Sequence, residues 1–148
     1  ADAFAMTPMF RRAVGGASEA DLDAATIPVE DVGGPVLLVS GGDDRLWPSR
    51  DLAGVVVDRL DDRGYDHHYE HVTYDDAGHV VGVPYLPARD RSAGDVPVIA
   101  GLPLALGGTP EGYAEADPDS WERVLAHLDR GLDGDTADGE RAAHPGEG

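Results

Sequence analysis

A short apolar run that stops abruptly at two glycines and two aspartates constrains this chain more than any other feature. Residues 36–40 read Val-Leu-Leu-Val-Ser, and Gly41-Gly42-Asp43-Asp44 follows directly. A strand that is apolar at consecutive positions is typical of a parallel sheet whose two faces are both covered. The pattern therefore predicts an α/β fold in which polar residues leave the carboxyl end of a buried strand.

A helix and a second strand follow this run. Residues 50–63 predict a helix because apolar side chains recur at helical spacing, at Leu52, Val55, Val56 and Leu60. We expect Ser49 to cap the start of this helix and Gly64 to end it. Residues 69–74 predict the second strand, after which Gly78 frees the backbone for a turn that presents His79.

The order strand, helix, strand has a geometric consequence. Such a crossover makes the two strands parallel, so that Asp44 and His79 would lie at the same edge of one sheet. Open α/β sheets bind their ligands at this edge. An aspartate that accepts the Nδ1 proton of a histidine orients it as a general base, and this pairing is part of a hydrolase triad. Asp43 competes for the acid role, but its place favours capping of the turn.

No nucleophile accompanies this pair. Ser18 and Ser49 occupy positions typical of helix caps, Ser92 lies in a loop, and Ser120 lies near a helix start. None of them follows a strand in the way that a nucleophile elbow requires. The serines of this sequence therefore offer no nucleophile for the pair.

The rest of the chain divides into three further segments. Residues 1–26 predict an incoming arm with a short helix capped by Ser18. Residues 80–111 are rich in Gly and Pro and predict a long loop, and a last helix is expected to begin near Asp117-Pro118. Residues 133–148 predict a disordered acidic tail, which leaves 27–132 as the main domain.

Composition excludes several classes of function. The chain holds 29 acidic and 11 basic residues, a formal net charge of -18, and every basic residue is Arg. We interpret this charge as a whole-surface adaptation to a salt-rich cytoplasm, and it argues against nucleic acid and anionic membranes as partners. The chain lacks cysteine and a long apolar run. We expect no cofactor and no metal, since His67, His68 and His71 do not form a ligand set.

Several ordered motifs resemble one family. Gly41-Gly42-Asp43-Asp44-Arg45-Leu46-Trp47-Pro48-Ser49, Ala77-Gly78-His79 with Pro84-Tyr85, and Leu106-Gly107-Gly108-Thr109-Pro110 resemble the C-terminal domain of the acyl-CoA thioester hydrolases over about residues 27–132. That family includes the bile acid-CoA:amino acid N-acyltransferases and is related to the dienelactone hydrolases. The resemblance implies the C-terminal portion of an α/β-hydrolase fold, with parallel strands and crossover helices. It also implies a Ser or Cys–Asp–His triad, in which Asp44 matches the acid and His79 the base. The nucleophile of the family lies N-terminal to the acid and matches no residue here, so the resemblance implies that this chain is truncated before it.

The resemblance leaves two residues with open roles. Trp47 either lines an acyl pocket or is a buried aromatic beside the acid, and Arg45 either meets the phosphates of coenzyme A or forms a surface ion pair. Two hypotheses for the whole chain follow. It contributes the Asp–His part of a thioester or ester hydrolase, completed by an upstream half or a second copy, or it is an inactive remnant that binds a ligand or a partner. A receiver-like acidic pair is disfavoured because the chain has no Lys.

Overall fold

The computed structural model describes residues 3–83, 96–99 and 102–141. In chain order its elements are α1 (Thr7–Gly16), α2 (Glu19–Ala25), the short 3-10 helix η1 (Val29–Asp31), β1 (Val36–Gly41), α3 (Ser49–Arg63), β2 (Tyr69–Tyr74), β3 (Val96–Ile99), β4 (Leu102–Leu104) and α5 (Pro110–Arg141). Strands and helices alternate along the central part of the chain. The predicted α/β class is confirmed.

β1 and β2 form a parallel pair, and α3 is the crossover between them. Their register runs from Val36 opposite Tyr69 to Gly41 opposite Tyr74. Both strands therefore end at the same edge, as the strand–helix–strand order predicts. β3 and β4 form a separate antiparallel pair inside the segment that was expected to be a loop.

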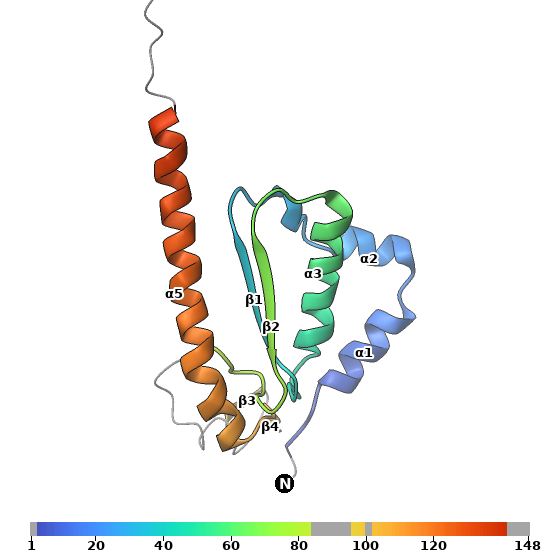
Figure 1. Ribbon diagram of the computed structural model, residues 1–148. Helices are drawn as coiled ribbons and strands as arrows, with labels where there is room; N and C mark the ends of the chain where they lie inside the picture. The colour runs from blue at the N-terminus through green and yellow to red at the C-terminus, as the bar shows by residue number, and fades with distance from the viewer. Residues whose placement is uncertain (1–2, 84–95, 100–101, 142–148) are drawn as a thin grey trace, which may run out of the picture.

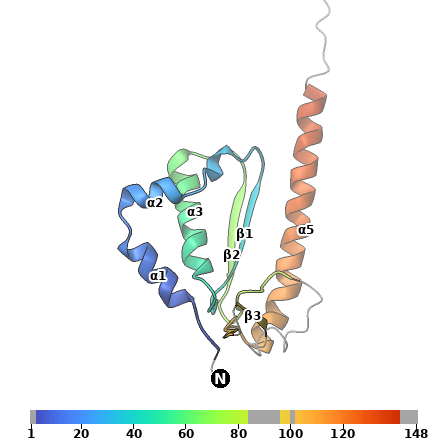
Figure 2. The same cartoon turned by 180° about the vertical axis from the view of Figure 1, so that it is seen from behind.

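Helices cover both faces of the β1–β2 pair (Figure 1). The view from behind shows the same layers, with α3, α1 and α2 on one side and α5 on the other (Figure 2). Side chains that alternate along β2 define the two faces. The Tyr69 hydroxyl bonds Asp61 of α3, whereas the Tyr74 hydroxyl donates to Asp119 of α5 at 2.5 Å. Burial on both faces explains why β1 is apolar at consecutive positions.

The crossover helix ends as predicted but begins differently. Gly64 adopts φ 63°, the left-handed conformation that a glycine at a helix C-terminus supplies cheaply. Ser49 was expected to be the N-cap, and this prediction is wrong: Pro48 holds that position and Ser49 is already helical. The Ser49 hydroxyl instead donates to the Gly41 carbonyl at 3.2 Å, which ties the helix to the end of β1.

The last helix corrects two expectations. It starts at Pro110, with the Thr109 hydroxyl accepting from the Gly112 N–H at 2.9 Å, and Pro118 lies in its interior. Burial of Tyr113 and Ala116 holds this first part against the core and outweighs the backbone hydrogen bond that Pro118 cannot make. The helix also continues to Arg141, into the segment predicted as a disordered tail from 133 onward. Residues 142–148 of that tail lie outside the described residues.

The arm before β1 holds two helices. Ser18 caps α2, as predicted, because its hydroxyl oxygen accepts from the Asp21 N–H at 3.2 Å. The preceding helix α1 was not predicted, although Pro8 lies in its first turn, where proline is tolerated. α1 packs near the carboxyl end of the strands, since the Met6 N–H donates to the Arg45 carbonyl at 2.9 Å. The arm thus reaches the edge where Asp44 lies.

Candidate active site

Asp44 and His79 meet at the carboxyl edge of the parallel strands. The Nδ1 atom of His79 lies 3.1 Å from the Oδ2 atom of Asp44, within hydrogen-bond distance. The predicted approach of these two residues is confirmed. An acceptor at Nδ1 favours the tautomer that carries its proton there, so that Nε2 is the nitrogen with a lone pair for a reacting group.

Backbone N–H groups fix the carboxylate of Asp44. Its Oδ1 atom accepts from the N–H of Leu46 at 2.9 Å and from that of Trp47 at 3.1 Å, which leaves Oδ2 to His79. Only 2% of the Asp44 side chain is exposed, against 20% of the His79 side chain. Thr7, which no motif marks as a site residue, donates its hydroxyl to the Asp44 carbonyl at 2.8 Å. The acid is therefore rigid and buried, and the base is more accessible.

Asp43 is used for a different purpose. Its Oδ2 atom accepts from the Gly108 N–H at 2.9 Å, and its Oδ1 atom accepts from Arg45 Nε at 3.0 Å. Both oxygens are therefore engaged away from His79. The expectation that Asp43 caps a turn rather than pairing with the histidine agrees with this geometry.

Trp47 lies directly beside the candidate base. Its ring meets the His79 imidazole edge to face, with centroids 4.6 Å apart, and it makes a second edge-to-face contact with Phe10 of α1, with centroids 6.4 Å apart. Trp47 is still 43% exposed, so it is not the fully buried aromatic that was one of its two expected roles. Arg45 is exposed and pairs with Asp43, which matches the surface ion pair that was expected as an alternative.

The serine hydroxyls in the described residues bond partners other than His79. Ser18 caps α2, Ser49 donates to Gly41, and Ser120 donates to the Asp117 carbonyl. Ser40 is buried and lies 2.8 Å from His71 Nε2 and 2.9 Å from the Thr73 hydroxyl. Ser92, Pro84 and Tyr85 lie outside the described residues.

The Ser40–His71–Thr73 cluster lies on the face of the sheet that α3 covers. Burial lowers the pKa of His71, and the nearby positive charge of Arg50 lowers it further. A histidine in this environment stays neutral near pH 7 and satisfies the buried hydroxyls around it. The cluster is therefore interpreted as internal polar packing.

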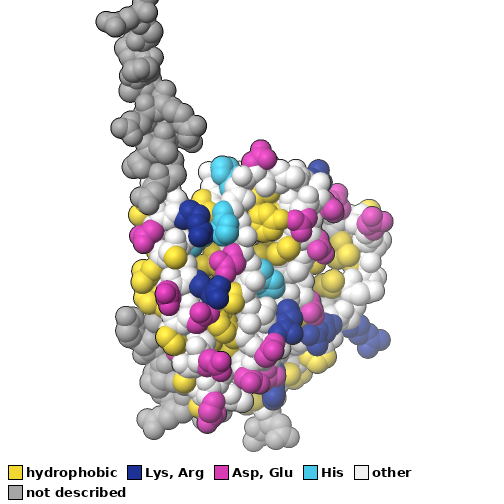
Figure 3. Space-filling view, in the orientation of Figure 1, with side chains coloured by type: hydrophobic (Ala, Val, Ile, Leu, Met, Phe, Trp, Pro, Cys, Tyr) yellow, Lys and Arg dark blue, Asp and Glu magenta, His cyan; other side chains and the backbone are white. Residues whose placement is uncertain are grey.

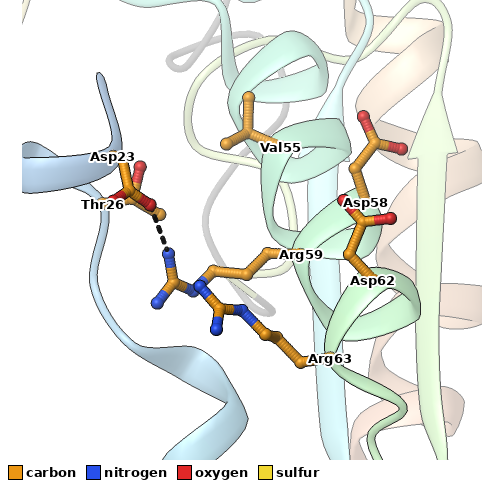
Figure 4. Close-up of a pocket in the computed structure, with 7 residues that line it drawn as sticks. All are labelled: Asp23, Thr26, Val55, Asp58, Arg59, Asp62 and Arg63. Carbon is orange, nitrogen blue, oxygen red and sulfur yellow. Dashed lines mark ion pairs between the residues drawn. The ribbon is translucent and has the colours of Figure 1, made fainter. Parts of the chain in front are cut away.

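A pocket of about 250 Å³ lies between α2 and the last turns of α3 (Figure 4). Its lining carries charges of both signs, and Arg59 pairs with Asp23 at 3.5 Å across it. Arg59 and Arg63 also pair with Glu30. The cations that line this pocket are thus occupied by carboxylates of the same chain, and Asp44 and His79 do not line it.

Three further properties concern the surface and the helices of the described residues. Acidic side chains are spread over the face shown in Figure 3. The described side chains include no cluster of three or more His, Cys, Asp or Glu able to hold a metal ion. Among the helices in the described part of the chain, none combines the length and apolar character needed to cross a bilayer.

A parallel sheet with an acid–histidine pair at its carboxyl edge defines the C-terminal part of an α/β-hydrolase. The family model described as BAAT / Acyl-CoA thioester hydrolase C terminal matches residues 3–134, and the chain belongs to this family. The match begins before Ile27, so it includes α1 and α2 as well as the motifs. The predicted family and fold are confirmed.

Curated relatives from Mus musculus carry related names. Acyl-coenzyme A thioesterase 6 is 30% identical over 109 residues, 74% of this chain and 25% of that protein. Peroxisomal succinyl-coenzyme A thioesterase is 30% identical over 113 residues, 76% of this chain and 25% of that protein. Acyl-coenzyme A amino acid N-acyltransferase 1 is 33% identical over 98 residues, 66% of this chain and 23% of that protein. The chain thus spans about a quarter of the length of these relatives.

Proposed function

We propose that this chain supplies the Asp–His half of an acyl-CoA thioester hydrolase site, with Asp44 orienting His79 as the general base. The observation that carries the proposal is the 3.1 Å contact between Asp44 Oδ2 and His79 Nδ1, made by an acid that backbone N–H groups already fix. Family membership and the names of the relatives support the acyl-CoA substrate.

The chemistry assigned to His79 follows from its free nitrogen. Nε2 accepts the proton of a serine hydroxyl or cysteine thiol while the serine oxygen or cysteine sulfur attacks the carbonyl carbon of the thioester. The carbon–sulfur bond then breaks, and the same proton passes to the leaving coenzyme A thiolate. A water molecule or an amine takes the acyl group in a second cycle of proton transfer. Asp44 stabilises the imidazolium in both cycles without taking its proton.

Two neighbours of the base are assigned to the substrate. Trp47 is half-exposed and contacts His79, so its free surface is suited to an apolar acyl chain beside the reacting carbon. Arg45 has an exposed guanidinium two residues from Asp43, to which it is paired. We assign it to the phosphates of coenzyme A, for which it would have to exchange this ion pair.

The nucleophile is assigned to a further segment of polypeptide that pairs with β1. The Val36 N–H donates to the carbonyl of His68, just before β2, and the Gly42 N–H donates to that of Tyr74 in β2. The N–H groups of the intervening Leu37 and Val39 therefore point toward the other edge of β1. In the described residues no strand pairs with that edge. β1 is apolar from Val36 to Val39 and carries no charged residue that would protect an edge, whereas β2 contains Glu70. A strand with the composition of β1 is suited to a central place in a larger sheet.

Thioesterase assays in molar salt test the proposal. This chain, the same chain extended upstream, and His79→Ala and His68→Ala variants of the longer chain are compared on a panel of acyl-CoA substrates. We expect activity only in the longer chain, a loss of at least about 100-fold in His79→Ala, and no change in His68→Ala, since His68 is exposed at the far end of β2. Equal activity in the two variants would refute the role of His79.

A second candidate function has one observation in its favour. The hydroxyls of Ser18, Ser40, Ser49 and Ser120 are all engaged away from His79. An inactive remnant that binds a ligand or partner would have this property. Absence of activity from the longer chain, together with saturable binding of acyl-CoA, would favour it.

A further inference from the structure

A third loop joins the two turns that carry Asp44 and His79. We call residues 105–109 the bridging loop. Its Leu106 carbonyl accepts from the His79 N–H at 2.9 Å and, in a longer contact, from the Arg45 N–H at 3.4 Å. Leu106 is only 4% exposed, so this oxygen has little access to water. One buried acceptor therefore connects the backbone of the base with the backbone next to the acid.

Asp43 anchors the bridging loop from the other side. Its carboxylate accepts the Gly108 N–H at 2.9 Å, two residues after the shared carbonyl of Leu106. Its own N–H donates to the Ala77 carbonyl at 3.0 Å, in the turn that leads to His79. Asp43 is thus bonded to the bridging loop and to the histidine turn, and it is covalently joined to Asp44.

Close backbone packing leaves the bridging loop little freedom. A Cβ on Gly107 would overlap the Asp43 carbonyl oxygen, and a Cβ on Gly108 would overlap the Gly78 nitrogen. Both glycines have positive φ, 76° and 77°. Because the loop rests directly on both turns, a displacement of the loop moves the acid and the base relative to each other.

From these contacts we propose that Asp43 is a positioning residue for the Asp44–His79 pair, acting through the hydrogen bond that its carboxylate accepts from Gly108. The inference rests on the proposed function for the identity of the pair. The physical reason is the small tolerance of a hydrogen bond, since side chains in such sites must be held within about 0.5 Å of the working geometry. Without the anchor, a small shift of the loop and its Leu106 carbonyl is enough to disturb the orientation of His79 toward Asp44.

Nitrogen NMR of the His79 ring tests this inference without any enzymatic activity. The ring ¹⁵N shifts of the neutral imidazole report which nitrogen carries the proton, and in the wild-type chain we expect the Nδ1–H tautomer to dominate. Asp44→Ala sets the value for complete loss of the acceptor. We expect Asp43→Ala to produce at least about half of that change, because the pair separates.

Two further variants separate the hydrogen bond from its alternatives. Asp43→Asn keeps an oxygen acceptor for Gly108 and is expected to retain the wild-type tautomer. Asp75→Ala removes an exposed carboxylate of the histidine turn and is expected to change nothing. A wild-type tautomer in Asp43→Ala would overturn the inference. Equal changes in the Ala and Asn variants would also overturn it, because the charge of Asp43 would then be the cause.

One more variant covers a failure to fold. If Asp43→Ala is unfolded by circular dichroism, Asp43→Glu replaces it, since it keeps the charge and moves the acceptor by one methylene group. The expected result is again a partial loss of the Nδ1–H tautomer, and an unchanged tautomer would overturn the inference. Because the readout needs neither nucleophile nor substrate, it stays informative if the proposed thioesterase activity is not found.

Discussion

The two ends of the β1–β2 pair differ in how closely other parts of the chain pack against their glycines. At the carboxyl end, a Cβ on Gly41, Gly78 or Gly107 would overlap the backbone of a neighbouring segment. At the amino end, a Cβ on Gly33 or Gly34 would meet no atom within 4 Å. One end is thus packed backbone against backbone, and the other is open.

The difference follows from what each end holds. The amino end is joined by side chains, among them the ion pair of Glu30 with Arg59 and the Tyr65 hydroxyl, which donates to the Val32 carbonyl at 2.8 Å. Side chains change rotamer easily, so such an end tolerates small movements. The carboxyl end holds Asp44 against His79, and there close backbone contact adds to the hydrogen bond that the Asp43 carboxylate accepts from Gly108. Four substitutions test this comparison.

The largest effect is expected for Gly107→Ala at the packed end. The added Cβ would overlap the Asp43 carbonyl, and the residue would keep a positive φ that alanine disfavours. We expect a loss of about 4 kcal/mol or more in the free energy of unfolding, enough to unfold a marginal domain. Urea unfolding in molar salt, followed by circular dichroism, measures it. A loss below about 1 kcal/mol would mean that the carboxyl end is not rigid.

A smaller loss is expected for Leu60→Ala, near the amino end. Leu60, in the last turns of α3, is fully buried, and removing a buried leucine side chain costs about 3 kcal/mol. Leu52→Ala is the matched control on the same helix, since Leu52 is 39% exposed. The same urea titration compares the two variants. Equal losses would show that apolar burial does not hold this end together.

The ion pair at the amino end predicts a pH dependence. The hydrogen bonds from Arg59 lower the pKa of Glu30 from its ordinary value of 4.5 to about 2. A lowered acid pKa contributes stability that is present above the ordinary value and is lost as the pH falls toward the folded one. The free energies of unfolding of wild type and Glu30→Gln should therefore differ near about pH 6 and converge toward about pH 2. A difference that is independent of pH would contradict this assignment.

The smallest effect is expected for Gly33→Ala, the counterpart of Gly107→Ala. Nothing lies near the added Cβ, and φ at this position is outside the left-handed region. The substitution mainly restricts the unfolded chain, so we expect a change between zero and a gain of about 1 kcal/mol. Thermal unfolding of the two alanine variants side by side gives the contrast directly. Destabilisation of Gly33→Ala by more than about 1 kcal/mol would remove the distinction between the ends.

The part of the fold that the sequence predicts is the part with local signals. β1, α3 and β2 follow from consecutive apolar residues, helical spacing and the glycine at position 64, all of which act over a few residues. The start of α5 does not follow from local signals. Pro118 predicts a helix start near residue 118, but burial of Tyr113 stabilises an earlier turn, and the helix begins at Pro110. Tertiary packing overrode local preference there. α1 also depends on distant contacts, such as the hydrogen bond from Thr7 to Asp44.

The candidate site divides in the same way. Asp44 and His79 were predicted because their residue types are diagnostic and a crossover brings strand ends together. Leu106 contributes its backbone carbonyl, which accepts from the N–H groups of His79 and Arg45. Every residue has such a carbonyl, so the residue type at position 106 could not predict this contact. The roles of Asp44 and His79 in catalysis, and of Trp47 and Arg45 in substrate binding, stay predictions that the assays above address.

The glycine contacts also bear on how substitutions combine. Gly41 lies against Gly78, and Gly78 lies against Gly107, so three positions far apart in the sequence share one line of backbone contact. Once a side chain at one of them has forced the segments apart, a second side chain has less to displace. Double substitutions along this line are then less harmful than the sum of the single ones. The free energy of unfolding of one of these glycine variants alone is therefore a poor guide to that of a variant that changes two of them.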